Sequence, residues 1–358
     1  MSDLLKEVYT RNYLEEVARE FKRNYKSFNS KLFISTVLSN DWKKLELKMR
    51  MKRITFSLNK VLPKEYDKSI VVLTKSSKKF SGYQAMFFPD YVETYGRDSE
   101  NITKSLDALE ELTKYSSSEF AIRPFIIADK NKVMKKMLSW SRSKNYHVRR
   151  LSSEGCRSRL PWAVALKSFK EDPSLILPIL ENLKDDPELY VRKSVANNLN
   201  DISKDHPDLA LEISKKWYGV SKDTDWIVKH GLRTLLKQGD LRALRIIGYS
   251  DSKNLAIRNI KVDGKVNIGL SLNFSFELNV AKKSKVRLEY KIYYLKSNGS
   301  HNSKVFKISE GEYSKGSYEV LKKQSFKEMT TRKHYSGKHF LSIVVNGEES
   351  SKVEFRVL

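Results

Sequence analysis

Three acidic residues stand in strongly basic stretches of this 358-residue chain. Glu119 lies in SSSEFAIRPFI, Glu154 in VRRLSSEGCRSRLPWA, and Asp201 in VRKSVANNLNDISKDHPD. A carboxylate among arginines can stabilise a positive charge that develops in a reaction. It can equally form an internal ion pair that joins neighbouring helices. The residues alone leave both interpretations open.

A repeat relates these positions to one another. Segments HVRR, YVRK and IVKH are each predicted to open an amphipathic helix after the helix-entry residues Asn145, Asp186-Pro187 and Asp223-Thr224-Asp225. Their valines are 43 and 37 residues apart, a period typical of HEAT-like helix pairs. In this register Glu154, predicted like Glu119 to lie on a helix, corresponds to Asn197, and Asp201 lies one turn further on the same face. An ordinary helical bundle is the alternative.

The remaining pattern divides the chain into two domains. Residues 1–250 show helical spacing nearly throughout, which predicts a HEAT-like α-solenoid with a concave face for a large ligand. In residues 255–358, runs such as Val266–Val280 and Val286–Tyr294 alternate apolar and polar residues, as strands with one buried face do. Gly-containing turns separate about seven such strands, which predicts an immunoglobulin-like β-sandwich.

The charge of the chain indicates a polyanionic partner. Lys and Arg number 68 against 43 Asp and Glu, a net charge of +25, and both predicted domains are basic. Because lysine and arginine neutralise phosphates, nucleic acid is the first partner to expect. Charge alone also fits a ribosome or an anionic membrane.

Several kinds of chemistry find no support in the sequence. It contains no Walker loop, dinucleotide fingerprint, HExxH or nucleophile elbow, and the histidines show no metal-ligand spacing. Cys156 is the single cysteine, which excludes an intramolecular disulfide. We therefore expect neither cofactor nor metal. The sequence has no apolar signal core and no membrane-spanning run, so we expect the protein in the cytoplasm, in the bacterial cytosol or nucleoid. We also expect it to be a monomer.

The segments SSSEFAIRPF, YHVRRLSSEGCRSRLPWA and YVRKSVANNLNDISKDHPDLA resemble the AlkC branch of the AlkD-like DNA glycosylases over roughly residues 20–250. Those enzymes are HEAT-like repeat proteins that excise alkylated bases, and some carry a C-terminal immunoglobulin-like domain. The resemblance implies that 3-methyladenine and 3-methylcytosine in duplex DNA are the substrates. It also implies that Glu119 and Glu154 are catalytic, and Asp201 with them.

The implied reaction fits carboxylates. N3-methylation makes the base cationic and therefore a good leaving group, so the enzyme has to stabilise the oxocarbenium-like sugar. A carboxylate beside the deoxyribose does so electrostatically and orients the attacking water. The resemblance further implies side chains that hold the DNA without reading its sequence; these are Arg123, Arg149, Arg150, Arg157, Arg159, Trp162, Arg192, Lys193, Asn197 and Lys229.

Two other functions stay open at this point. One is a non-catalytic HEAT-repeat protein that binds DNA or RNA as an architectural module, and the other is a protein-binding adaptor. The sequence does not fix the preference between the two methylated bases. It also leaves open whether the base is flipped or exposed by bending, which tryptophans face DNA, and whether the β domain clamps the duplex.

Overall fold

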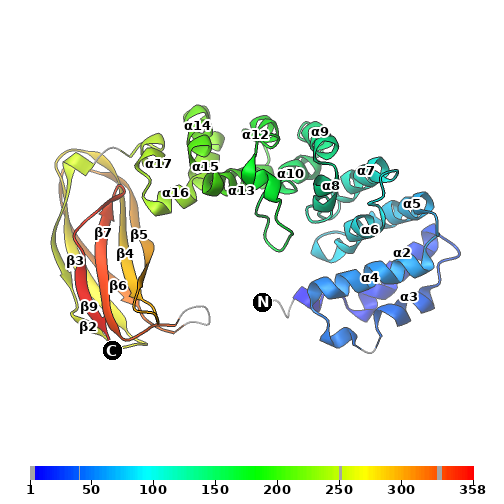
Figure 1. Cartoon of the computed structure of the whole chain (residues 1–358), viewed down its shortest axis with the longest axis horizontal. Coiled ribbons are helices and arrows are strands. Elements are labelled where there is room, and N and C mark those ends of the chain that lie inside the picture. The colour runs from blue at the N-terminus through cyan, green and yellow to red at the C-terminus, as the bar shows by residue number, and fades with distance from the viewer. Residues whose placement is uncertain (1–4, 40, 250–251, 329–332) are drawn as a thin grey trace. The chain divides into compact units, whose positions relative to one another are not determined.

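The computed structural model describes residues 5–39, 41–249, 252–328 and 333–358. Over these residues the chain is helical as far as Ile246 and forms strands from Leu255 onward (Figure 1). The predicted order, a HEAT-like α-solenoid followed by a β-sandwich, is therefore confirmed. No described helix is both long and apolar enough to cross a bilayer.

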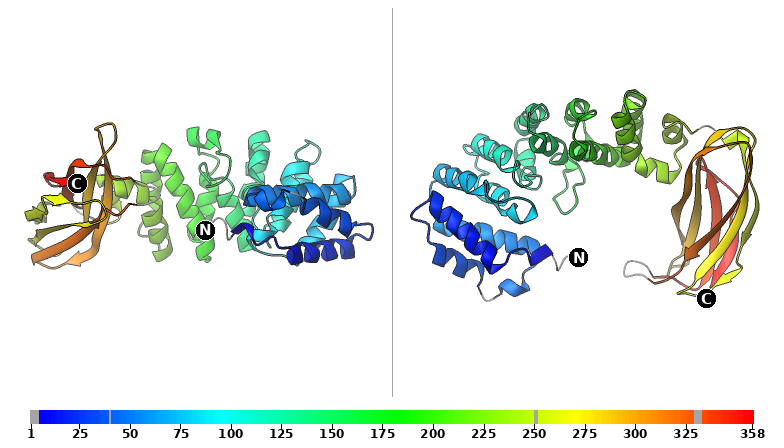
Figure 2. Two further views of the ribbon diagram at one scale, coloured as in Figure 1. Left: turned by 90° about the horizontal axis from the view of Figure 1, so that it is seen from below. Right: turned by 180° about the vertical axis from the view of Figure 1, so that it is seen from behind.

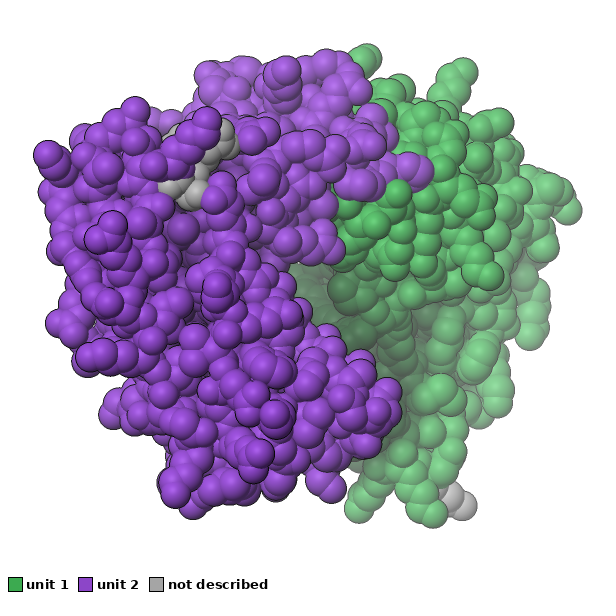
Figure 3. Space-filling model, turned by 60° about the vertical axis from the view of Figure 1, so that its left-hand side comes forward, with its two compact units in different colours: residues 1–205 green, residues 206–358 purple. Residues whose placement is uncertain are grey.

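The chain forms two compact units, residues 1–205 and residues 206–358, which Figure 3 shows in different colours. The change from helix to strand falls where the sequence predicts a domain boundary, between residues 250 and 255. The compact units divide earlier, because the last helices pack with the sandwich rather than with the first unit. The domain boundary itself stays a prediction.

Unit 1 is a two-layer stack of short helices (Figures 1 and 2). Helix α9 packs on α10 and α12, and α13 packs on α10 and α12, so the pairs α9–α10 and α12–α13 stack on each other. Val148 and Leu151 of α10 and Val191 of α13 are fully buried between them. The helices are α2 (Arg11–Asn24), α3 (Ser30–Val37), α4 (Leu47–Val61), α5 (Tyr66–Ser77), α6 (Phe87–Tyr95), α7 (Ile102–Leu112), α8 (Arg123–Ala128), α9 (Lys130–Trp140), α10 (Tyr146–Glu154), α11 (Lys167–Glu171), α12 (Leu177–Leu183) and α13 (Leu189–Asp205).

Helix starts agree with the predicted repeat in two of three copies. Asn145 caps α10 by accepting from the backbone amides of its first turn, as expected. The third copy differs: α15 (Lys222–Gly231) begins five residues before Ile227, because Ser221 and Thr224 form a capping box there. Glu119 also differs from the prediction, since it lies in a turn four residues before α8 rather than on a helix.

In the described part of unit 2, helices α14 to α17 precede the sandwich. The helices are α14 (Pro207–Trp217), α15, α16 (Arg233–Gln238) and α17 (Leu241–Ile246). One sheet has the order β1-β3-β6, and the other has β2-β9-β7-β4-β5 with β8 beside β7. The strands are β1 (Leu255–Val262), β2 (Lys265–Val266), β3 (Ser271–Val280), β4 (Ser284–Leu295), β5 (His301–Tyr313), β6 (Gly316–Ser325), β7 (Gly337–Val345), β8 (Glu348–Glu349) and β9 (Val353–Val357).

The alternating residues of the strands build the core of the sandwich. Leu272, Phe274, Phe276 and Leu278 of β3 are buried against residues of the facing sheet. Leu241 and Leu244 of α17 lie against Gly347 so closely that a side chain at this glycine would clash with them. Lys285 Nζ also donates to the carbonyl oxygen of Ile247 at 2.5 Å. These contacts explain why α14–α17 belong to the same compact unit as the strands.

Candidate functional site

Glu119, in the turn before α8, and Glu154, at the end of α10, meet at one guanidinium group. Arg150 Nη1 donates to the Glu119 carboxylate and, at 3.0 Å, to Ser117 Oγ. Its Nη2 lies 3.6 Å from Glu154 Oε1. The ring of Tyr190 packs beside the same guanidinium, with the ring centroid 5.0 Å from Cζ. Arg150 therefore joins both predicted catalytic carboxylates.

A second arginine links Glu154 to Asp201. Arg157 Nη1 donates to Glu154 Oε1 at 2.7 Å, and its Nε donates to Asp201 Oδ2 at 2.9 Å. Lys204 Nζ donates to the other oxygen of Asp201 at 3.1 Å. The three acids and their three cations form a chain of alternating charges, which we call the carboxylate cluster: Glu119, Arg150, Glu154, Arg157, Asp201 and Lys204.

Helix geometry accounts for the cluster. Arg150 lies one helical turn before Glu154 on α10, and Arg157 lies three residues beyond the end of this helix, so both guanidinium groups reach the Glu154 carboxylate. The stacking of α13 on α10 brings Asp201 to Arg157. The sequence repeat therefore positions the acids, although it does not specify their partners.

The carboxylates differ in exposure. The Glu119 side chain is 15% exposed, that of Glu154 is 7% exposed, and that of Asp201 is 2% exposed. Burial lowers the pKa of Arg150 and Arg157, but the nearby carboxylates outweigh this effect and raise the pKa of both guanidinium groups. Both arginines therefore stay charged. Of the three acids, Glu119 is the most accessible to a ligand.

Several arginines that were predicted to contact DNA bond within the protein. Arg149 makes a two-bond contact to Asp186, at 2.6 and 3.0 Å. Arg159 pairs with Asp205, and Arg192 donates to the carbonyl oxygens of Asp186 and Pro187. Arg150 and Arg157 serve the carboxylate cluster. The ion pairs that were the second interpretation of this pattern are thus present, and DNA contacts by these residues stay predictions.

Arg123 does not fit the predicted DNA contact. Its side chain is fully buried. Its guanidinium donates to the carbonyl oxygens of Gly155, Arg157 and Val164. Burial lowers its pKa to about 10, so it still carries its charge at neutral pH. A phosphate cannot reach this group, because backbone surrounds it.

The other predicted contacts lie at the surface. Trp162 is 65% exposed. Lys193 and Lys229 are exposed, and Asn197 is half-buried. Trp140 and Trp217 are buried in the core, as most tryptophans at helical spacing are. Trp226 is half-buried and stacks on His230, with 3.8 Å between the ring centroids.

Sequence reasoning did not find three members of this region: Ser117, Tyr190 and Lys204. Tyr190 is the second residue of α13 and takes the repeat position that His147, the second residue of α10, takes in that helix; this equivalence is the one signal in the sequence. Lys204 follows Asp201 at helical spacing, but such pairs are common on solvated faces. Among the described residues, no group of three His, Cys, Asp or Glu side chains could hold a metal ion.

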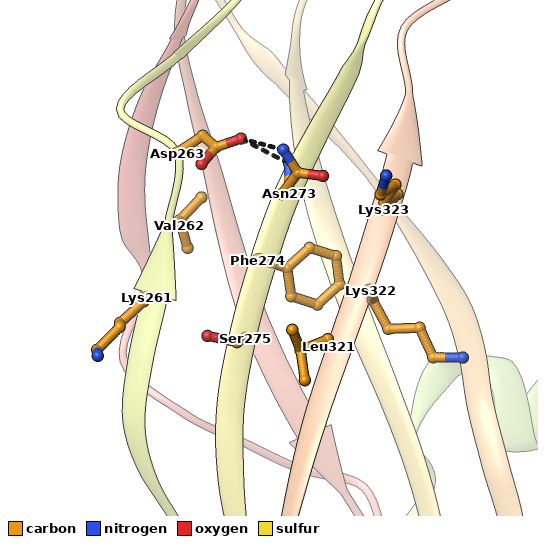
Figure 4. A pocket seen from close by; sticks show the side chains of 9 residues that line it. All are labelled: Lys261, Val262, Asp263, Asn273, Phe274, Ser275, Leu321, Lys322 and Lys323. Atoms are coloured by element: carbon orange, nitrogen blue, oxygen red, sulfur yellow. Dashed lines mark hydrogen bonds between the residues drawn. The ribbon is translucent and has the colours of Figure 1, made fainter.

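A cavity of about 380 Å³ lies elsewhere, on the sandwich (Figure 4). Its single lining carboxylate, Asp263, accepts from the backbone and side-chain nitrogens of Asn273 at 2.9 and 2.7 Å. The exposed side chain of Leu321 lies at its edge. The lining residues offer no second acid beside Asp263, so the cavity lacks the paired groups of the carboxylate cluster.

Stacked HEAT-like helix pairs that hold an arginine-bridged acidic cluster, together with a β-sandwich, define a class of helical-repeat proteins with an appended immunoglobulin-like domain. Residues 116–235 match the family model described as "DNA alkylation repair enzyme". Residues 256–358 match the model described as "Uncharacterised protein YhaZ, C-terminal Ig-like domain". The first match includes Glu119, Glu154 and Asp201.

Two relatives match the whole chain. The uncharacterized protein YhaZ of Bacillus subtilis is 45% identical over all of both chains. The solved structure of the Pseudomonas fluorescens alkylpurine DNA glycosylase AlkC, bound to DNA containing an abasic site analog, is 38% identical and covers 99% of each chain with a TM-score of 0.90. The chain therefore belongs to the DNA alkylation repair enzyme family, in the AlkC-like glycosylase branch with a C-terminal immunoglobulin-like domain. This confirms the resemblance drawn from the sequence.

Proposed function

We propose that this protein is a monofunctional DNA glycosylase that excises cationic N3-alkylated bases, 3-methyladenine and 3-methylcytosine, from duplex DNA. The observation that carries the proposal is the convergence of Glu119 and Glu154, which lie 35 residues apart in the sequence, on the guanidinium of Arg150. The solved relative that binds DNA with an abasic site analog supports the same class of substrate.

The reaction is hydrolysis of the N-glycosidic bond. The base departs with the bonding electron pair, which neutralises its positive charge, and the sugar becomes an oxocarbenium-like cation. A carboxylate beside the deoxyribose stabilises that cation, and it can accept the proton of the water that attacks C1′. We assign this role to Glu119 and Glu154.

Arg150 and Arg157 fix the acids before substrate arrives. A carboxylate that is already held in place needs no reorganisation when the cation forms, and this is the main advantage of a preorganised site. Asp201 is nearly inaccessible and bonds Arg157 and Lys204. We therefore assign Asp201 the role of holding Arg157, rather than a contact with the sugar.

A basic surface would bring the DNA to the cluster. Lys193 and Lys229 are exposed and available for phosphates, and Trp162 is available for stacking on a base. Arg149, Arg159 and Arg192 contact phosphates only if DNA replaces some of their present partners. The sandwich, which has a net positive charge of its own, would add contacts to the duplex backbone.

The test is release of the free base from duplexes that carry one N3-methyladenine or one N3-methylcytosine. We expect excision by the wild-type protein and loss of about 100-fold or more in single-turnover rate for Glu154→Gln. Glu154→Gln should still bind a duplex with an abasic-site analogue. Absence of excision by the wild-type protein on both duplexes would refute the proposal.

The alternative is a non-catalytic DNA- or RNA-binding module. It is favoured by one observation: each acid of the carboxylate cluster already has a cationic partner, as in a purely structural network. This alternative predicts tight binding to undamaged duplex without base release. The excision assay separates the two functions.

A further inference from the structure

Arg123 is a fully buried cation whose guanidinium donates to backbone oxygens. Nε and Nη2 both donate to the Val164 carbonyl oxygen, with Nε at 2.7 Å. Nη1 donates to the carbonyl oxygens of Gly155 at 3.0 Å and Arg157 at 2.8 Å. Burying a charge is costly unless its hydrogen bonds are made inside the protein. Such a placement therefore requires an explanation.

The acceptors belong to one segment, residues 155–166, which we call the Trp162 loop. The loop follows α10 and, in Figure 1, extends away from the layer of α9 and α12. Arg123 donates to Gly155 and Arg157 at the start of the loop and to Val164 near its end, so one side chain holds both ends of the loop together. The amide of Leu166 also donates to the carbonyl oxygen of Ser158 at 3.2 Å, which closes the loop.

The loop holds a strained residue at its tip. Trp162 has a φ of +64°, a left-handed conformation that is a genuine outlier for a bulky side chain. Such conformations persist where the surroundings determine them, and they cluster at functional sites. The Trp162 carbonyl oxygen accepts from Lys48 Nζ, and the indole remains 65% exposed. The loop is thus built to present an aromatic side chain.

We infer that Arg123 is a positioning residue that clips the Trp162 loop, and that it acts on DNA only through this loop. It sets the direction of Trp162 at the tip and fixes the backbone of Arg157, whose side chain holds Glu154 and Asp201. One buried side chain therefore connects the exposed tryptophan to the carboxylate cluster. The DNA contact of Trp162 rests on the proposed function. The hydrogen bonds by which Arg123 holds the loop do not depend on that function.

The first test examines the clip without DNA. Lysine retains the charge but cannot span three carbonyl oxygens, so Arg123→Lys should loosen the loop. Limited trypsin digestion followed by mass spectrometry should show cleavage after Arg159 at least 10-fold faster than in wild type. The matched control is Arg50→Lys. Arg50 is also buried and donates to backbone carbonyl oxygens, but these belong to Leu45 and Lys6, which lie outside the Trp162 loop. Equal resistance of Arg123→Lys and Arg50→Lys at this site would overturn the inference.

The second test is a double-mutant cycle on binding to a duplex with an abasic-site analogue. Trp162→Ala should weaken binding roughly 5- to 20-fold, as loss of a stacked aromatic ring does. Arg123→Lys should weaken it by a similar factor, and the double variant should bind no worse than Trp162→Ala. Arg50→Lys should leave the effect of Trp162→Ala unchanged even if it lowers the melting temperature as much.

The outcomes separate the inference from the proposed function. Multiplied effects in the double variant would show that Arg123 and Trp162 act independently, which overturns the inference while leaving the glycosylase intact. If Trp162→Ala bound the duplex as tightly as wild type, Trp162 would not be a DNA contact. The proposal that Arg123 acts on DNA through Trp162 would then be overturned. Coupled effects together with loop cleavage in Arg123→Lys would support the inference, even for a protein that excises no base.

Discussion

The carboxylate cluster and the cavity on the sandwich differ in how many acids they hold and in what those acids contact. The cavity has a volume of about 380 Å³, but its one carboxylate is satisfied by Asn273. The cluster brings together an acid from the turn before α8, one from α10 and one from α13 in a line of alternating charges. Catalysis requires groups that are oriented and held in place, and this is why the cluster, rather than the cavity, is our proposed site of the reaction.

A second contrast concerns buried arginines. Arg157 in unit 1 and Arg287 in unit 2 each lie between two carboxylates: Arg157 between Glu154 and Asp201, and Arg287 between Glu289 at 2.7 Å and Glu310 at 3.5 Å. The local chemistry is the same in both regions. What differs is the neighbourhood, because only the first arginine holds an acid that adjoins the more accessible Glu119. Function is thus inferred from the arrangement, not from the presence of ion pairs.

The largest expected effect separates the two regions directly. Glu119→Gln should lower single-turnover excision about 100-fold, since an amide cannot stabilise the oxocarbenium-like sugar as a carboxylate does. Asp263→Asn in the sandwich cavity should leave the rate within twofold of wild type. Base release from an N3-methyladenine duplex measures both. Equal rates for the two variants would remove the distinction between cluster and cavity.

The next effect compares the two buried arginines. Arg157→Met leaves Glu154 and Asp201 with less compensation, and removing one partner of a buried pair costs about 3 kcal/mol. Arg287→Met should destabilise the protein by a similar amount through its own carboxylates. Denaturant unfolding measures both losses, and excision below the unfolding transition should fall only for Arg157→Met. If Arg287→Met lost as much activity, the cluster would have no special role.

These particular residues show what the sequence could predict. The spacing of Val148 and Val191 predicts the repeat, and the alternation in β3 predicts the sandwich. Both are predictable because an element with one buried face has apolar residues at regular intervals in its sequence. The repeat also placed Glu154 and Asp201 on neighbouring helices. The hydrogen-bond partners could not be predicted. The sequence gives Arg123 and Arg150 the same expected DNA contact, but the guanidinium of Arg123 bonds backbone oxygens and that of Arg150 bonds carboxylates. Only the packing of the helices decides which carbonyl or carboxylate lies within reach.

Truncation tests how much of the DNA affinity comes from the sandwich. A chain that ends at residue 254 should bind undamaged duplex about 10-fold more weakly than the full chain. Its plot of log affinity against log salt should be shallower by about one for each phosphate that the sandwich neutralises. Because the truncation uncovers Leu241 and Leu244, the melting temperature of the remaining helices has to be measured alongside. Unchanged affinity and slope would refute a DNA contact by the sandwich.

The smallest expected effect is a pH dependence that a buried histidine of the sandwich contributes. His339 of β7 is fully buried, and burial lowers its pKa below the ordinary value of about 6.5. The nearby His301 and His334 add to this effect, while the bond from Nδ1 to the Gly337 carbonyl oxygen at 3.2 Å opposes it. The unfolded chain therefore takes up a proton more readily than the folded one as the pH falls through about 6.5, and stability declines there.

His339→Phe removes the titrating group and keeps a ring in contact with Phe355, which lies 5.6 Å from the histidine between ring centroids. Between pH 7.5 and 5.5 the melting temperature should therefore fall about 2 °C less in this variant than in wild type. Should His339→Phe instead follow the wild-type curve, the acid sensitivity would lie in groups other than the buried histidine of the sandwich.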